Sequence, residues 1–182
     1  MRAFPYLLMT GAMALAMQAQ GLAMEAGMEI FSEAFAPDER IPAKYTCEGA
    51  DISPPLAWRD VPEGTRALAL IVDDPDAPDP AAPRMTWVHW VVANIPPQAK
   101  GLAEGASMKA MPQGAVEGIN DWHRQGYGGP CPPIGAHRYF FRLYALDAPL
   151  PHEPLTKPAL LEAMKGHVLA KAELVGIYEK GR

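Results

Sequence analysis

Apolar residues gather in short runs along the chain, and aspartate, proline or glycine bounds most of these runs. Residues 66–73 form a compact apolar run that predicts a buried strand. Residues 85–95 form a second run, and the proline-rich link between the two is too short for a crossover helix. We therefore expect 66–73 and 85–95 to pair as antiparallel strands. Further extended segments are predicted at 25–37, 115–119, 136–147 and 172–178.

One segment near the C-terminus has the spacing of an amphipathic helix. Thr156 can cap its first turn, and Pro158 suits that turn because the backbone N–H that proline lacks would be unpaired there. Its apolar positions recur at helical spacing and are Leu160, Leu161, Met164, Val168 and Leu169. Because the other segments are extended and most of the 20 prolines would interrupt helices, the chain is predicted to be a mainly β domain.

The first 23 residues have the composition of an export signal. Arg2 is the only charged residue before Glu25, and residues 7–17 are mainly Ala, Leu and Met. This apolar core is shorter than the roughly 20 residues that a membrane-spanning helix needs, so we expect cleavage and not anchoring. The prediction is a signal peptide at 1–23, a single domain at 24–182, and a periplasmic or secreted protein.

The charge of the chain limits its partners. Removal of residues 1–23 leaves 15 basic and 21 acidic residues, a net charge of −6. An acidic chain without a run of Lys or Arg is unsuited to nucleic acid, whose phosphates attract basic surfaces. No later stretch is long and apolar enough to cross a membrane. The sequence therefore predicts neither a nucleic-acid partner nor a stable membrane span.

Cys47 and Cys131 are the only cysteines in the sequence. In an exported protein such a pair is most simply a disulfide that closes a long loop, worth on the order of 4 kcal/mol in the chain-entropy picture. The alternative is that Cys131 is a nucleophile, because it lies near two histidines. Export favours the disulfide, and a disulfide removes the nucleophile.

The turn between the first two apolar runs is rich in carboxylates, and its sequence is Asp73-Asp74-Pro75-Asp76-Ala77-Pro78. In the strand that follows, alternation places Trp87 and His89 on one face and Val88 and Trp90 on the other. One imidazole and one indole are therefore expected beside a group of acids.

The strand predicted at 136–147 repeats this arrangement, with His137 and Tyr139 on one face. Just before it, residues 126–133 form a loop in which glycines allow close backbone approach and prolines add stiffness. If the two strand starts and their loops converge, they form a pocket with His and Tyr donors and Asp to orient them. We interpret this pattern as a site for a small anion.

Four ordered motifs carry a resemblance to a known family: Asp74-Pro75-Asp76-Ala77-Pro78, Trp87-Val88-His89-Trp90, Gly128-Gly129-Pro130-Cys131-Pro132-Pro133 and His137-Arg138-Tyr139. Together they resemble the phosphatidylethanolamine-binding protein family, especially its bacterial, Raf kinase inhibitor-like branch. The resemblance implies two antiparallel sheets packed as a Greek-key sandwich, with one C-terminal helix, few short helices and a ligand pocket at one end. The implied ligand-binding residues are Asp74, Pro78, Trp87, His89, Gly129, Pro132, His137 and Tyr139.

The same resemblance implies a non-catalytic binding protein without a cofactor, whose ligand carries a phosphoryl or other anionic group. A carboxylate in the pocket would repel a dianion unless it bonds to an imidazole N–H or meets an ammonium on the ligand. An ethanolamine-type head group supplies such an ammonium. Binding is then expected to weaken above the histidine pKa values. Some family members inhibit kinases or proteases, so a protein partner is expected, and related bacterial proteins suggest a homodimer.

A hydrolase or transferase is the alternative class, with His89, His137 and Asp74 acting together with a metal ion or Cys131. The sequence has no G-x-S-x-G elbow, no G-x-x-x-x-G-K-[ST] phosphate loop and no H-E-x-x-H zinc helix. We therefore predict no catalytic residue and no metal site, and we favour the binding protein.

Overall fold

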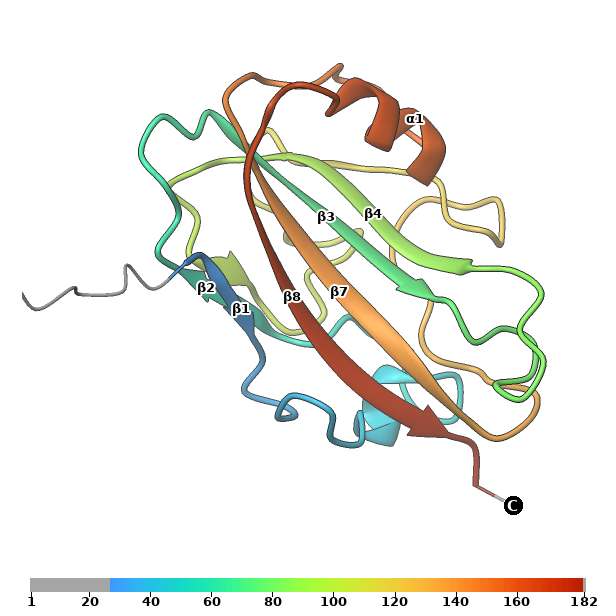
Figure 1. The fold of residues 1–182 in the computed structure, drawn as a ribbon. Helices are drawn as coiled ribbons and strands as arrows, with labels where there is room; N and C mark the ends of the chain where they lie inside the picture. The colour runs from blue at the N-terminus through green and yellow to red at the C-terminus, as the bar shows by residue number, and fades with distance from the viewer. Residues whose placement is uncertain (1–26, 182) are drawn as a thin grey trace, which may run out of the picture.

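Two antiparallel sheets dominate the structure, a computed structural model that describes residues 27–181 (Figure 1). The smaller sheet has the order β1 (Glu29–Phe31), β2 (Leu56–Arg59), β5 (Gly101–Leu102). The larger sheet has the order β6 (Val116–Glu117), β4 (Trp87–Ile95), β3 (Ala67–Asp74), β7 (Ala136–Leu146), β8 (Val168–Glu179). The described helices are a 3₁₀ turn, η1 (Ala43–Tyr45), and α1 (Lys157–Ala163). The predicted mainly β fold with two antiparallel sheets is confirmed.

The strand order of the larger sheet follows the Greek-key rule. β3, β4 and β6 lie side by side in chain order, whereas β7 returns to pair with β3 and β8 pairs with β7. A fourth strand that returns beside the first defines this topology. The segment between β6 and β7 makes the return, and it includes a long loop at residues 120–135. The loop crosses the end of the sheet where Asp74 pairs with Trp87.

Both faces of the larger sheet are covered. One face packs against the smaller sheet through a core that includes Trp58, Trp90 and Phe141. On the other face, Leu160 of α1 packs in a second core with Ile71 of β3. All eight residues of β3 are buried as a result. The continuous apolar run correctly predicted a buried strand, and the structure shows that this strand is buried on both faces.

A β-bulge in β4 changes the face of the larger sheet on which its side chains lie. Val72 pairs with Trp90 and Asp73 pairs with Val88, so His89 has no opposing residue on β3. Trp90 therefore packs in the core between the sheets, whereas Val88 packs in the core beneath α1. The prediction that Val88 and Trp90 share a face is wrong, because strict alternation does not continue through the extra residue.

α1 is shorter than the apolar spacing predicts. The helix ends at Ala163, and Gly166, with φ of 80°, turns the chain toward the next strand. Val168 and Leu169 continue the helical spacing, but they are the exposed first residues of β8. Thr156 occupies the N-cap position without a side-chain hydrogen bond. The predicted extent of the helix is wrong, whereas Thr156 does stand at the N-cap position and Pro158 lies in the first turn.

A buried carboxylate joins α1 to the larger sheet. Asp73 is fully buried and accepts hydrogen bonds from Arg142 of β7 and from Lys157 at the start of α1. Arg142 also donates through Nε to Glu173 of β8 at 2.8 Å. Because two cations flank the Asp73 carboxylate, the cost of removing its charge from water is offset.

The remaining predicted strands differ from the observed ones mainly in length. Within the described residues, segment 25–37 contains only the short β1, segment 115–119 contains β6, and segment 172–178 is the second half of β8. The signal peptide predicted at 1–23 lies outside the described residues. Within 27–181, no helix has the length and apolarity needed to cross a membrane.

Candidate functional site

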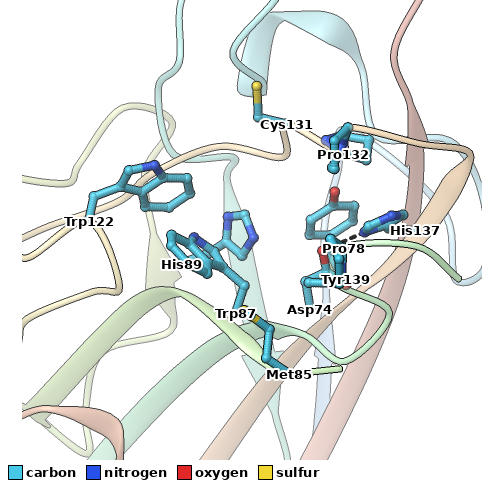
Figure 2. Close-up of a pocket in the computed structure, with 12 residues that line it drawn as sticks. Asp74, Pro78, Met85, Trp87, His89, Trp122, Cys131, Pro132, His137 and Tyr139 are labelled. Atoms are coloured by element: carbon cyan, nitrogen blue, oxygen red, sulfur yellow. Dashed lines mark hydrogen bonds and ion pairs between the residues drawn. The ribbon is translucent and has the colours of Figure 1, made fainter. Parts of the chain in front are cut away.

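A cavity of about 410 Å³ lies where β3 ends and where β4 and β7 begin. Figure 2 shows side chains from these strands and their loops gathered around it. The lining residues are Asp74, Ala77, Pro78, Met85, Trp87, His89, Trp122, Cys131, Pro132, Pro133, His137 and Tyr139. Cavities of this volume hold small-molecule ligands.

Seven of the eight residues predicted to bind a ligand line this cavity, and Gly129 does not. The backbone N–H of Gly129 donates to Oδ1 of Asp51 at 2.6 Å. A Cβ at position 129 would lie 2.5 Å from the carbonyl oxygen of Tyr45. Glycine therefore lets the loop approach the segment around Tyr45 closely, and its part in the site is to position that loop.

Five lining residues were not predicted to contact a ligand, namely Ala77, Met85, Trp122, Cys131 and Pro133. Trp122 is edge-on to Trp87 and to His89, with ring centroids 5.4 and 5.1 Å apart. Trp122 and Met85 are 39% and 50% exposed, so the cavity has an apolar mouth. A large aromatic in a long loop was a sequence signal for Trp122, whereas Met85 gave none.

The loop after β6 holds His89 in one tautomer. Nδ1 of His89 lies 2.7 Å from the carbonyl oxygen of Gly128, and the Gly128 N–H donates to the His89 carbonyl at 3.0 Å. A carbonyl oxygen only accepts, so Nδ1 carries the proton and Nε2 of the neutral ring is an acceptor. Burial lowers the pKa of His89 to about 4, which keeps the ring neutral at neutral pH.

His137 and Asp74 form a buried pair in the cavity wall. Nδ1 of His137 lies 2.7 Å from Oδ2 of Asp74, and Nε2 lies 3.0 Å from the carbonyl oxygen of Ile134. Oδ1 of Asp74 also accepts the Asp76 N–H at 2.8 Å. Burial raises the pKa of the Asp74 carboxyl, and the bond from His137 opposes that rise. Both imidazole nitrogens are engaged inside the protein, so this pair orders the wall of the cavity.

Two buried donors of the cavity are unpaired. Among residues 27–181, the only buried side-chain polar atoms without a hydrogen-bond partner are Nε1 of Trp87 and the hydroxyl of Tyr139, and both residues line the cavity. Burial raises the pKa of Tyr139 far above its usual range, so the hydroxyl keeps its proton. Figure 2 shows this hydroxyl directed toward Pro132. Unpaired buried donors are rare and cost about 1–3 kcal/mol each, which marks this cavity as a site for a hydrogen-bond acceptor.

The charges around the cavity are balanced within the protein. Among residues 27–181, no Lys or Arg lines it, and the one carboxylate that does, Asp74, is bonded to His137. The nearby Arg138 binds Asp76 instead, with Nη2 2.7 Å from Oδ1, and this bond lowers the pKa of Asp76. A cavity without surplus positive charge suits a neutral, zwitterionic or singly charged group better than a dianion.

The disulfide predicted from sequence is present between Cys47 and Cys131, whose Cα atoms lie 5.4 Å apart. Cys131 therefore offers no thiol nucleophile to the cavity. No group of three or more His, Cys, Asp or Glu side chains in the described part of the chain is arranged to hold a metal ion. His137 has both ring nitrogens bonded to oxygen atoms of the protein. The hydrolase or transferase alternative gains no support from this site.

Fold and cavity together define a β-sandwich protein with a small-ligand pocket at one end. A sequence model of the phosphatidylethanolamine-binding protein family matches residues 31–179. A UPF0098 protein of Methanothermobacter thermautotrophicus is 52% identical over 156 residues, which are 85% of this chain and 100% of that protein.

Two crystal structures are similar to this fold at comparable coverage. A putative phosphatidylethanolamine-binding protein homologue from Chlamydia trachomatis has a TM-score of 0.78 at 47% identity, covering 85% of this chain and 99% of its own. YbcL of E. coli, described as a new member of the mammalian family of that name, has a TM-score of 0.77 at 33% identity, covering 86% of this chain and 100% of its own.

The chain belongs to the phosphatidylethanolamine-binding protein family. Its similarity to YbcL fits the bacterial branch of that family, as the ordered motifs of the sequence predicted.

Proposed function

We propose that this protein binds a small ligand through a phosphoryl or similar oxyanion group in the cavity and does not transform it. The observation that carries the proposal is the pair of unpaired buried donors, Nε1 of Trp87 and the hydroxyl of Tyr139. Oxygen atoms of an oxyanion accept from both donors, which recovers the hydrogen bonds that burial denies them. Family membership supports the same broad class, a ligand that carries a phosphoryl group.

The head group that fits best carries little net charge. The Asp74 carboxylate already bonds to His137, and no Lys or Arg in the described part of the chain lines the cavity to balance a dianion. A phosphoethanolamine-type group brings its own ammonium, which offsets one unit of the negative charge that its phosphoryl group would carry into such a cavity. Met85 and Trp122 at the mouth would contact the less polar part of the ligand.

The test is calorimetric titration of the purified protein with phosphate and with phosphoethanolamine. Trp87→Phe and Tyr139→Phe each remove one donor and are expected to weaken binding about tenfold, the equivalent of one lost bond to a charged group. Tyr144→Phe is the matched control, because Tyr144 packs beside the core beneath α1 and is not part of the cavity. Saturable binding that both cavity variants retain at full strength would contradict the proposal.

We also propose export, a homodimer and regulation of a protein partner such as a kinase or protease, on the strength of the predicted signal peptide at 1–23 and of the family resemblance. Mass analysis of protein from a periplasmic fraction tests export, and loss of the first 23 residues is expected. Recovery of the uncleaved chain from the cytoplasm would contradict export.

Sedimentation of the periplasmic protein tests the homodimer, and a monomer at every concentration would contradict the homodimer. Added kinases and proteases test the regulatory role, and unchanged activities would contradict it.

A further inference from the structure

The cavity presents one acceptor as well as two donors. The donors are Nε1 of Trp87 and the hydroxyl of Tyr139. The acceptor is Nε2 of His89, because the bond from Nδ1 to Gly128 fixes the proton on the other side of the ring. The side-chain hydrogen bond found for the His89 ring among residues 27–181 is the one made by Nδ1. Tyr139 and Trp122 pack edge-on against the ring, each with a centroid 5.1 Å away, and hold it in place.

A fully deprotonated oxyanion does not match this set. Its oxygens accept from Trp87 and Tyr139, but an oxygen placed against Nε2 of His89 meets a second lone pair. The mismatch disappears if one ligand oxygen carries a proton, because that P–OH donates to Nε2. The two donors and one acceptor of the cavity then face two acceptors and one donor of the ligand.

We infer that His89 makes this pocket selective for a phosphate monoester in its singly protonated form, R–O–PO₃H⁻, over the dianion and over phosphodiesters. The inference rests on the proposed function, since it specifies which oxyanion the same cavity takes. A diester has no P–OH, and a dianion has lost it. Sites built to bond a ligand hydroxyl reject analogues that lack it, because a polar group of the site is then left unpaired.

The groups that surround His89 leave this selectivity intact. From β7 it meets the Tyr139 hydroxyl, which stays protonated because burial raises its pKa. The His137 and Asp74 side chains are bonded to each other in the same wall. On the other face of the sheet end, the Asp73 charge is held by Arg142 and Lys157.

One further group completes these surroundings. The Asp121 carboxylate accepts the backbone N–H of Val88, and no Lys or Arg lines the cavity. The low pKa of His89, about 4, supports the same selectivity, because it keeps the ring neutral. A protonated ring would donate a hydrogen bond from Nε2 and would no longer prefer a ligand that carries a P–OH.

A consequence is that the proton belongs to the ligand and not to a histidine. The expectation that binding weakens above the histidine pKa values is therefore replaced by one tied to the second pKa of the ligand, about 6 for a phosphate monoester. Above that pKa, the singly protonated form and the apparent affinity both fall about tenfold per pH unit.

The experiment is a calorimetric titration at several pH values between about 5 and 8 with four probes. Methyl phosphate and methylphosphonate carry a P–OH at low pH but differ in their second pKa, whereas dimethyl phosphate and sulfate carry none. We expect methyl phosphate to bind at least tenfold more tightly than dimethyl phosphate or sulfate at about pH 5.5. We also expect the pH midpoint to shift upward for methylphosphonate, which has the higher second pKa.

The variant that isolates the acceptor is His89→Asn, whose amide NH₂ can still donate to the Gly128 carbonyl but leaves no atom at the place of Nε2. The ratio of monoester to diester affinity should fall to near one in this variant, while Tyr144→Phe keeps the full ratio. A thermal unfolding scan establishes that each variant is folded.

The possible results distinguish the role of His89 from the proposed oxyanion site. Equal binding of dimethyl phosphate and methyl phosphate, or one pH midpoint shared by both protonated probes, overturns the role of His89 but leaves the oxyanion site in place. An unchanged affinity ratio in His89→Asn overturns it as well. Absence of heat from all four probes and from phosphoethanolamine overturns the proposed function together with this inference.

Discussion

Asp73 and Asp74 are neighbours in sequence, but they meet opposite surroundings. Asp73 is fully buried under α1 and receives hydrogen bonds from Arg142 and Lys157. Asp74 lies in the cavity wall with His137 as its partner, beside unpaired donors of Trp87 and Tyr139. One face of the strand end is therefore complete in its ion pairs and hydrogen bonds, whereas the other is incomplete because two neutral donors lack partners. The difference teaches that, within residues 27–181, this fold confines its unpaired buried side-chain donors to residues of the cavity wall.

The largest predicted effect on stability concerns the disulfide, which lies on the cavity side only. Its cysteines are 84 residues apart, and closing a loop of that length stabilises the fold by about 4 kcal/mol in the chain-entropy model. The double variant Cys47→Ala/Cys131→Ala should lose about that amount in denaturant unfolding. A loss below about 1 kcal/mol would mean that the unfolded chain is not restrained by this bond.

Acid should act first on the cavity side through His89. Its pKa is about 4 when folded and about 6.5 when unfolded, so the unfolded chain binds the extra proton between these values. Stability from this ring is complete above about pH 6.5 and falls as the pH drops toward 4, by about 3 kcal/mol. Unfolding curves from about pH 4 to 7 measure this slope, and His89→Asn should flatten it. Identical slopes in both proteins would contradict the buried neutral ring.

Breaking the ion pairs of Asp73 on the side beneath α1 should lower the stability by a similar amount. Asp73→Asn leaves Arg142 and Lys157 without their carboxylate, and breaking a buried ion pair costs about 3 kcal/mol or more. We take the lower end because both cations are about one-fifth exposed. Asp147→Asn is the control, since Asp147 is half exposed and pairs only with His167. Equal stabilities for the two variants would show that the network under α1 is not what holds the helix.

Removing an unpaired donor from the cavity side should change the stability least, and it should raise the stability instead of lowering it. Tyr139→Phe removes a buried hydroxyl that has no partner, so the ligand-free protein should gain up to about 1 kcal/mol of stability. The same variant should bind phosphate about tenfold more weakly, which is the exchange of stability for function common at binding sites. Thermal unfolding with and without phosphate measures both, and a destabilised variant would show that the hydroxyl has a partner within the protein.

Much of this site follows from period-two alternation in the sequence. His137 and Tyr139 are both buried at the start of β7, as their spacing predicts, and Trp87 and His89 both line the cavity. The position of Trp90 could not be predicted, because nothing in the sequence marks the extra residue that the bulge inserts into β4.

Other features depend on contacts between distant segments. Val168 and Leu169 keep helical spacing beyond Gly166, but pairing with β7 places them in a strand. Trp122 reaches the cavity only because its loop crosses the end of the sheet. Which donors are left unpaired is a property of the folded chain, so neither Trp87 nor Tyr139 could be recognised as unpaired from sequence.

The most direct test of the account is the indole N–H signal of Trp87 in a ¹H–¹⁵N spectrum during titration with phosphate at about pH 5.5. Trp58 and Trp90 are internal controls, because their Nε1 atoms already donate to the Ala99 carbonyl and to Glu117, each at 2.7 Å. We predict that the Trp87 signal moves downfield and saturates, whereas those of Trp58 and Trp90 stay in place. A Trp87 signal that does not move while phosphate binds would contradict the claim that the unpaired donors of the cavity form the ligand site.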